Sequence, residues 1–570
     1  MKKKICVLVI VLLTAQTFAQ NFRTIWRTTA ATEQITIPTT GGGYNYNVDW
    51  GDGTADNLAV VGDVSHTYAV AGDYTVTISG DFPRIYFNNV GDKTKIRSIE
   101  EWGSAISWTS MERAFSGCSN LINNALDEPD LSGVTTLAFM FWNCASIGTG
   151  SSVRWNNWDT SSIIKMNYMF HSAVLFNKDL NNWNVSNVDT MERMFFGATV
   201  FNGNIGSWNT DSLLNMNRMF ANATAFNQEL IYNAVTHQWD TSEVTNMGFL
   251  FYGTDFNGDI SNWETGLVEI MSSLFSGNSS FNMDISGWDT SSATNMSFMF
   301  TGASSFNQDI SGWSTSNVAT FQNMFTNATA FNQDLSSWDV ENVTNMTNVF
   351  NGVTLSTKNY DAILIAWDAQ TLQNGVTFHG GNSKYYSPAA QAARANMIAS
   401  DSWTFTADGG LLTELEWTGA TDTDWNIASN WNEGIVPTSL QNVTVTNHPN
   451  NPTISAGVSA ASNGFILDMN ATLTINAGAN LTISDSFNQQ FDSETIIKSN
   501  ATSSGSLIMG SYVPTGKSTY QRYVKGGEWH LISTPVFSSA ISSFEADLMT
   551  SGTNISIATY DNSIVGPAIH

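Results

Sequence analysis

Between Trp155 and Phe350, hydrophobic positions return at a fixed interval. Tryptophans stand at Trp158, Trp183, Trp208, Trp239, Trp263, Trp288, Trp313 and Trp338. Subtracting neighbouring numbers gives gaps of 25, 25, 31, 24, 25, 25 and 25 residues. Such a period is the signature of a solenoid, in which stacked coils bury one another's apolar faces.

Each repeat closes on a phenylalanine, which predicts a leucine-rich-repeat-like solenoid of ten coils over residues 96–351. The closing residues are Phe115, Phe141, Phe170, Phe195, Phe220, Phe251, Phe275, Phe300, Phe325 and Phe350. Alternation at Trp338 and Val340 predicts a short strand with both side chains inward. Met346, Val349 and Phe350 recur at three and four residues, which predicts a helical or 3₁₀ turn on the opposite side.

Residues 20–95 predict a small β-sandwich, since short alternating runs are separated by the Asp52-Gly53 turn signal. Three segments resemble the PKD domain, an immunoglobulin-like sandwich: Trp50-Gly51-Asp52-Gly53-Thr54, His66-Thr67-Tyr68 and Gly72-Asp73-Tyr74-Thr75-Val76. The opening Val48-Asp49-Trp50 departs from that family's pattern, so the chain resembles a divergent member. The resemblance implies a spacer or adhesive module of a surface protein.

Residues 352–410 are expected to cap the solenoid. Tyr360–Trp367 has helical spacing, and Ser387 followed by Pro388 predicts the start of a second helix. Residues 411–515 predict a β-rich module, because Leu473–Ile483 alternates as in short β-solenoid coils. Residues 516–570 are expected to begin a further β segment that the sequence does not complete.

The first 19 residues predict a signal peptide. Three lysines at positions 2–4 precede the apolar run Ile5–Leu13, and Ala15–Ala19 offers a cleavage site. Nine apolar residues are too few to span a bilayer, and no later run is long enough. We therefore expect an exported protein, at the cell surface or secreted.

The net charge of the chain limits the classes of partner that it can bind. The chain has 49 Asp and Glu against 22 Lys and Arg, a net charge of −27. Nucleic-acid binding needs a basic surface, so a nucleic-acid partner is not expected. The seven histidines show no metal-ligand spacing.

An acidic column follows the repeats. Its members are Asp179, Glu229, Asp259, Asp284, Asp309 and Asp334. Bare carboxylates about 4.8 Å apart would repel one another, so they point to water, accept backbone donors or share cations. The first two are favoured, with calcium held by Asp259, Asp284, Asp309 and Asp334 as the alternative. No other cofactor is expected.

Cys118 and Cys144 each stand three residues after a closing phenylalanine, where later coils carry alanine. The two side chains should therefore be inward-facing neighbours. Stacking would place them within disulfide range, and an exported protein permits the bond. Two buried free thiols are an equally good reading.

The complete repeat has the form F-N-x-D-[LI]-x-x-W, followed by M-x-x-M-F. It resembles the BspA-like leucine-rich-repeat surface proteins, in the 25-residue form common in Mycoplasma lipoproteins and in marine Bacteroidetes. The resemblance covers residues 96–410 and implies cell-surface adhesion and binding of host or matrix proteins. That family has no binding motif, so no residue role is carried over.

We therefore expect a non-enzymatic adhesin, or a scaffold that binds an extracellular protein or glycan. The alternatives are a polysaccharide-degrading enzyme with accessory domains and a structural matrix component. Specificity is expected in the insertion Ile231–His237 and at one variable position. That position carries Lys178, Gly203, Gln228, Gly258, Met283, Gln308 and Gln333.

Overall fold

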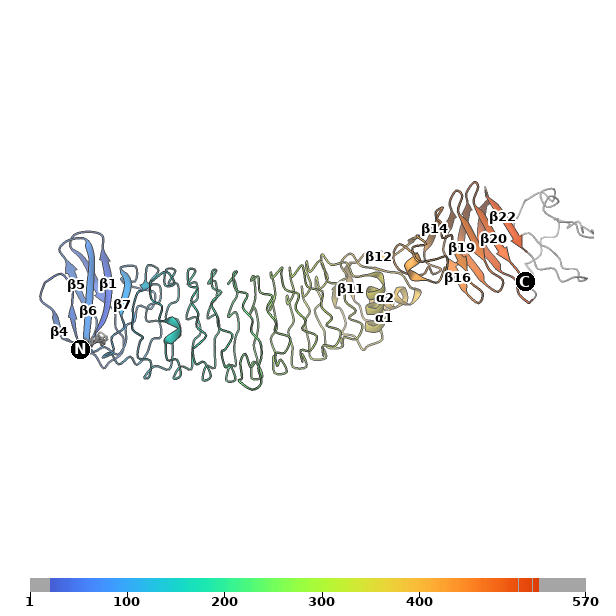
Figure 1. Cartoon of the computed structure of the whole chain (residues 1–570). Helices are drawn as coiled ribbons and strands as arrows, with labels where there is room; N and C mark the ends of the chain where they lie inside the picture. Colours follow the sequence, from blue (N-terminus) through green and yellow to red (C-terminus); the bar gives the residue numbers. More distant parts are fainter. Residues whose placement is uncertain (1–20, 501, 515, 522–570) are drawn as a thin grey trace, which may run out of the picture. The chain divides into compact units, whose positions relative to one another are not determined.

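The computed structural model describes residues 21–500, 502–514 and 516–521. The expected signal peptide and residues 522–570 lie outside these ranges. The chain divides after Thr413 into two compact units, coloured blue to yellow and orange to red in Figure 1. The fold is mainly β, with 24% strand and 6% helix, and forms a β-solenoid of about 18 turns.

The first unit begins with short strands, most of them antiparallel. They are β1 Phe22–Thr28, β2 Glu33–Ile37, β3 Asn45–Asp49, β4 Asn57–Val60, β5 Val64–Tyr68, β6 Gly72–Asp81, β7 Ile96–Glu101 and β8 Ile122–Asn123. One sheet has the order β4-β3-β6-β1-β7-β8, and β2 pairs with β5 in a second. Alternate side chains of β1 and β3 are buried.

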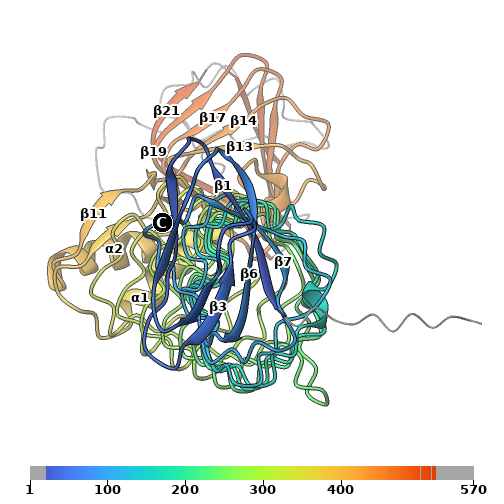
Figure 2. The same ribbon diagram turned by 90° about the vertical axis from the view of Figure 1, so that its left-hand side faces the viewer.

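The first sheet continues into the solenoid. β1 pairs with β7, and β7 pairs in parallel with β8, which belongs to the first repeat. Phe87 and Asn89 donate backbone hydrogen bonds to the first coil at Ala114 and Ser116, as each later coil does to its successor. The N-terminal strands therefore cover the end of the coil stack (Figure 2).

Successive coils lie side by side (Figure 1) and are joined by single parallel bridges. The bridged residues are Thr136, Lys165, Thr190, Asn215, Asn246, Ile270, Asn295, Thr320 and Asn345. The strand predicted at Trp338 and Val340 is wrong, although both side chains are buried. Trp338 and Val343 instead donate to carbonyls three residues earlier, so tight turns replace the strand. The phenylalanine side is also built from turns; η1 (Trp155–Asn157) is the one 3₁₀ helix described among the repeats.

Aromatic columns fill the solenoid. Closing phenylalanines stack on one another, for example Phe195 on Phe220 at 5.7 Å. Each also meets the next phenylalanine along the chain, as Phe195 meets Phe201 at 3.9 Å. The indole of Trp208 donates to the Leu180 carbonyl at 2.8 Å, and later tryptophans repeat this contact. Burial of each large aromatic contributes roughly 1.5–3 kcal/mol or more, so these columns dominate stability.

The cap contains the two predicted helices. They are α1 Thr357–Asp368 and α2 Pro388–Ser400, and Ser387 caps α2 with Pro388 as its first residue. Short parallel pairs extend the stack: β9 Thr377–His379 with β11 Thr404–Ala407, and β10 Lys384–Tyr385 with β12 Gly410–Leu411. The two helices expected in this segment are confirmed.

The second unit is a parallel β-solenoid, as the alternation of Leu473–Ile483 predicts. One sheet contains β13 Glu414–Trp417, β14 Asn442–Val445, β16 Ser459–Ser462, β17 Phe465–Leu467, β19 Asn480–Gln489 and β21 Ser506–Pro514. The other contains β15 Thr453–Ile454, β18 Thr472–Ile475, β20 Glu494–Lys498 and β22 Lys517–Gln521. The short helix η2 (Ala428–Asn430) precedes β14, near the packed tryptophans Trp417, Trp425 and Trp431.

Candidate functional site

Every coil has two residues with left-handed backbone. They are the third and the seventh residues, when the first residue of the M-x-x-M-F segment is counted as one. The third positions have φ between 53° and 61° and are Arg113, Phe139, Tyr168, Arg193, Arg218, Phe249, Ser273, Phe298, Asn323 and Asn348. The seventh positions are Gly117, Asn143, Ser172, Gly197, Asn222, Gly253, Gly277, Gly302, Asn327 and Gly352. The two positions share one backbone requirement and differ in residue type.

The seventh position follows conformational preference, whereas the third position does not. Glycine and asparagine adopt left-handed backbone readily, and they fill nine of the ten seventh positions. For bulky residues this conformation costs about 1–2 kcal/mol. The first six third positions nevertheless carry only Arg, Phe or Tyr, and asparagine returns at Asn323 and Asn348. Strain of this kind concentrates at functional sites.

We call those six residues the arginine–aromatic strip: Arg113, Phe139, Tyr168, Arg193, Arg218 and Phe249. All six are half-buried. The Arg113 guanidinium lies 4.2 Å from the Phe139 ring centre, which lies 4.5 Å from the Tyr168 ring centre. Arg193 lies over Tyr168 at 5.1 Å, and Arg218 over Phe249 at 3.9 Å. Since strip members occupy both faces of Phe139 and Tyr168, an outside partner meets the edges of these groups.

A second aromatic row lies beside the strip, made of Trp142, His171, Phe196 and Tyr252. The His171 ring stacks on Phe196 at 4.6 Å and on Tyr168 at 5.5 Å. Burial, followed by the nearby Arg193 charge, lowers the pKa of His171 to about 4. His171 is therefore a neutral part of this surface near pH 7.

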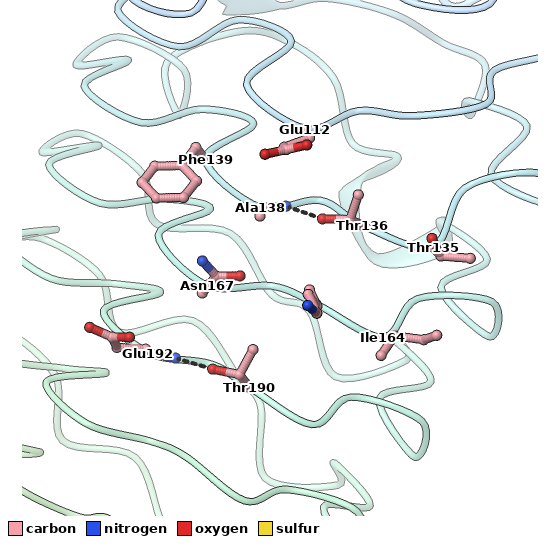
Figure 3. A pocket seen from close by; sticks show the side chains of 10 residues that line it. Glu112, Thr135, Thr136, Ala138, Phe139, Ile164, Asn167, Thr190 and Glu192 are labelled. Carbon is pink, nitrogen blue, oxygen red and sulfur yellow. Dashed lines mark hydrogen bonds between the residues drawn. The ribbon is translucent and has the colours of Figure 1, made fainter.

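An open groove of about 500 Å³ lies along the same coils (Figure 3). Its lining is Glu112, Thr135, Thr136, Ala138, Phe139, Ile164, Lys165, Asn167, Thr190 and Glu192. Glu112, Asn167 and Glu192 come from different coils at the same repeat position, next to the strip. Hydroxyl, amide, ammonium and carboxylate groups thus line the groove, with the Phe139 ring at one side.

The strip arginines differ in their acidic neighbours. Glu112 lies 3.7 Å from Arg113, and Glu192 lies 3.8 Å from Arg193. Arg218 has no carboxylate within ion-pair distance among the described residues; its guanidinium donates to the Asn217 side chain at 3.0 Å. Burial and then the Arg193 charge lower the pKa of Arg218. Positive charge is therefore least compensated at Arg218, and Glu192 is the one carboxylate beside the Arg193–Arg218 pair.

The acidic column makes hydrogen bonds to backbone donors. The carboxylates of Asp259, Asp284, Asp309 and Asp334 each accept from the backbone N–H two residues later, at 2.9–3.0 Å. Bonds from Ser286 and Ser311 lower the pKa values of Asp284 and Asp309. Within the described ranges, no three acidic, histidine or cysteine side chains gather closely enough to hold a metal ion. The arrangement fits the alternative in which these carboxylates accept backbone donors.

Cys118 and Cys144 are fully buried neighbours and are free thiols in this structure. The Cys144 thiol donates to the Phe115 carbonyl at 2.9 Å. Burial raises the pKa of both thiols, and a negative charge on Cys144 would raise that of Cys118 further. Buried neutral thiols are poor nucleophiles, so the pair belongs to the core.

The variable position expected to carry specificity is partly constrained by the scaffold. The Gln228, Gln308 and Gln333 side chains donate to carbonyls of the preceding coil. A Cβ on Gly203 would lie 2.1 Å from the Lys178 carbonyl oxygen. The inserted loop Ile231–His237 instead exposes apolar side chains, with Val235 88% accessible, and stands out from the coils in green in Figure 2.

The strip was not predicted from the sequence. Its signal was present, because the third position carries arginine or an aromatic residue in each of the first six coils and in one later coil, at Phe298. Its importance depends on backbone conformation, which the spacing does not reveal. The Trp, Met and Phe columns also dominate the repeat pattern and obscure it.

The fold and the site define a repeat solenoid with an unusual strip of side chains along its first six coils. Residues 109–234, 231–313 and 252–367 match the family model DUF285, described as a Mycoplasma protein of unknown function. Residues 416–562 match a domain of unknown function, DUF8693. Neither a curated protein nor a solved structure matches the chain. In the described part of the chain, no helix has the length and apolar character to cross a membrane.

Proposed function

We propose that the protein is an exported, non-catalytic surface scaffold that holds an extracellular protein or glycan against the arginine–aromatic strip and its groove. The observation that carries this proposal is the strip itself. Six successive coils keep bulky side chains in a backbone conformation that disfavours them, while the seventh position of those coils obeys the ordinary preference.

The proposal includes the adhesin role and its setting. The sandwich is interpreted as a divergent PKD-like module, and the repeats as ten BspA-like coils of the Bacteroidetes type. Export is expected from the sequence of the first 19 residues. Arginine and aromatic side chains also dominate interface hot spots, which supports a binding role for the strip.

Hydrolysis of a polysaccharide in this groove is disfavoured by geometry. Glu112 and Glu192 line the groove three coils apart. At about 4.8 Å per coil they lie about 14 Å apart. Glycosidases hold their two carboxylates within about 5–9.5 Å. A binding groove is the better interpretation.

The test uses the full-length mature protein on arrays of glycans and matrix proteins. Phe139→Asn with Tyr168→Asn removes two rings while supplying the residue best suited to left-handed backbone. Leu175→Asn with Leu267→Asn is the control, because it changes exposed apolar residues outside both the strip and the groove. We expect binding to one ligand class to fall about tenfold or more only in the strip variant, as for an interface hot spot. Equal binding by the two variants, or release of sugar fragments, would overturn the proposal.

A further inference from the structure

The chemistry of the strip and groove narrows the ligand further, on the basis of the binding role proposed above. We propose that this surface binds an anionic glycan, a sugar polymer bearing carboxylate or sulfate groups, with its acid groups on Arg193 and Arg218. The sugar hydroxyls lie along the groove from Glu112 to Glu192. The argument rests on ring stacking, arginine pairing, groove lining and charge distribution.

Ring stacking disfavours a neutral sugar. Sugar rings pack on the open faces of aromatic side chains, but both faces of Phe139 and Tyr168 are occupied by Arg113, by each other and by Arg193. The part of this stack that a ligand can reach is the N–H edge of the Arg113 and Arg193 guanidinium groups. Guanidinium binds carboxylate and sulfate through paired N–H donors, and stacking on a ring fixes its plane in advance.

Arg193 and Arg218 provide the strongest anion site. They stand at the same position in adjacent coils, joined by the Arg193 N–H bond to the Asn217 carbonyl at 2.9 Å. Their guanidinium groups have one nearby carboxylate between them, Glu192 at 3.8 Å from Arg193. The Arg193 guanidinium also donates to the Tyr168 hydroxyl, and the Arg218 guanidinium donates to the Asn217 side chain. An anion at this point would relieve the repulsion that lowers the pKa of Arg218.

The groove suits a glycan better than an acidic peptide. Thr135, Thr136, Thr190 and Asn167 offer small polar groups, and the two glutamates can accept from sugar hydroxyls. A peptide would bind by adding a strand to a free edge or by filling apolar pockets. In these coils the backbone N–H groups of the third and fifth positions already bond the next coil, so that edge is closed.

The charge distribution confines an anionic ligand to the first coils. Residues 219–357 contain no Lys or Arg and thirteen Asp or Glu. A polyanion is repelled there, whereas residues 113–218 nearly balance eight Asp or Glu with six basic residues, Arg113, Arg154, Lys165, Lys178, Arg193 and Arg218. The ligand therefore contacts a short, defined stretch of the solenoid.

Titration calorimetry on the full-length mature protein tests the proposal with polygalacturonate, its methyl-esterified form, dextran sulfate, dextran and polyglutamate. Arg193→Gln with Arg218→Gln is the test variant. Arg154→Gln is the matched control, because Arg154 pairs with Glu128 away from the strip. We expect polygalacturonate or dextran sulfate to bind, and binding to fall about tenfold or more in the double variant alone.

Three results would overturn the anionic glycan: equal binding of the esterified polymer, equal binding of polyglutamate, or binding of neither acidic polymer. The Phe139→Asn, Tyr168→Asn variant separates this failure from failure of the binding role. If an array ligand of another class is lost in that variant, the binding role stands and the glycan assignment fails. If that variant loses no ligand, both fail.

Discussion

The residue type at a left-handed position should have a measurable effect on the free energy of unfolding. The third position of the ninth coil is Asn323, with φ of 54°. Asparagine tolerates this conformation, whereas a β-branched side chain meets the adjacent backbone. We predict that Asn323→Val lowers the free energy of unfolding by about 1–2 kcal/mol.

Urea denaturation followed by tryptophan fluorescence measures this change. Thr347→Val is the control, since residue 347 is half-buried in the same solenoid and lies outside the left-handed positions. Its effect should stay within about 0.5 kcal/mol. Equal losses in the two variants would mean that the third position is not strained.

The Asp52 carboxyl makes the stability of the N-terminal strands depend on pH. Burial raises the pKa of this carboxyl, but bonds from Thr54 and His66 outweigh burial and lower it to about 2. A lowered pKa in the folded state stabilises the fold above the ordinary value near 3.8. That contribution is lost as the pH falls from about 4 to about 2.

We therefore predict that Asp52→Asn reduces the acid sensitivity of the sandwich. Urea midpoints measured between pH 5 and pH 2.5 should converge on those of the wild type at the acid end. Asp255→Asn, at an exposed position of a later coil, should leave the pH profile unchanged. A constant offset of Asp52→Asn across the range would contradict the link.

At the scale of the coil, close backbone approach limits which side chains fit. Gly203 lies against the Lys178 carbonyl, so we predict that Gly203→Ala costs about 1–3 kcal/mol through overpacking. Gln333→Ala is the comparison, because it removes exposed side-chain bonds to Asn307 and should cost at most about 1 kcal/mol. Thermal unfolding of both variants measures these losses of stability. A smaller loss for Gly203→Ala than for Gln333→Ala would show that the backbone relaxes around the added methyl group.

The acidic column yields a prediction about calcium at the same scale. Because Asp259, Asp284, Asp309 and Asp334 already accept backbone hydrogen bonds, they have little need of a cation. We predict that millimolar calcium and EDTA give melting temperatures within about 1 °C of each other. A saturating ion would add about 2–4 kcal/mol and several degrees. Such a shift would instead support the calcium alternative.

Much of the coil could be predicted from the sequence, because burial follows the repeat. Trp338, Val340 and Phe350 are inward as their spacing indicates, and the Ser387–Pro388 helix start is present. The strand at Trp338 could not be rejected in advance, since inward alternation also suits a chain of tight turns. The strip was missed for a similar reason: φ depends on how one coil crosses the next.

At the scale of the whole first unit, the sandwich and the solenoid share one core. Phe22 of β1 packs edge-on against Trp108 at 5.2 Å, and Trp102 packs against Trp158 at 5.4 Å. The buried Asp127 carboxylate accepts from the backbone N–H groups of Trp102 and Gly103, both at 2.9 Å. The sandwich thus covers the end of the repeat stack, a role that solenoids need for solubility.

This shared core predicts that the boundary expected at residue 95 does not separate two independent folding units. A fragment covering residues 96–413 would expose Trp102, Trp108 and the β7 edge that pairs with β1. We predict aggregation, or loss of a cooperative unfolding transition, in that fragment, whereas residues 21–413 remain monomeric and cooperative. Light scattering and calorimetry distinguish the two. A monomeric, cooperative 96–413 fragment would show that the repeats need no cover at this end, and that the sandwich is a spacer joined to a self-sufficient solenoid.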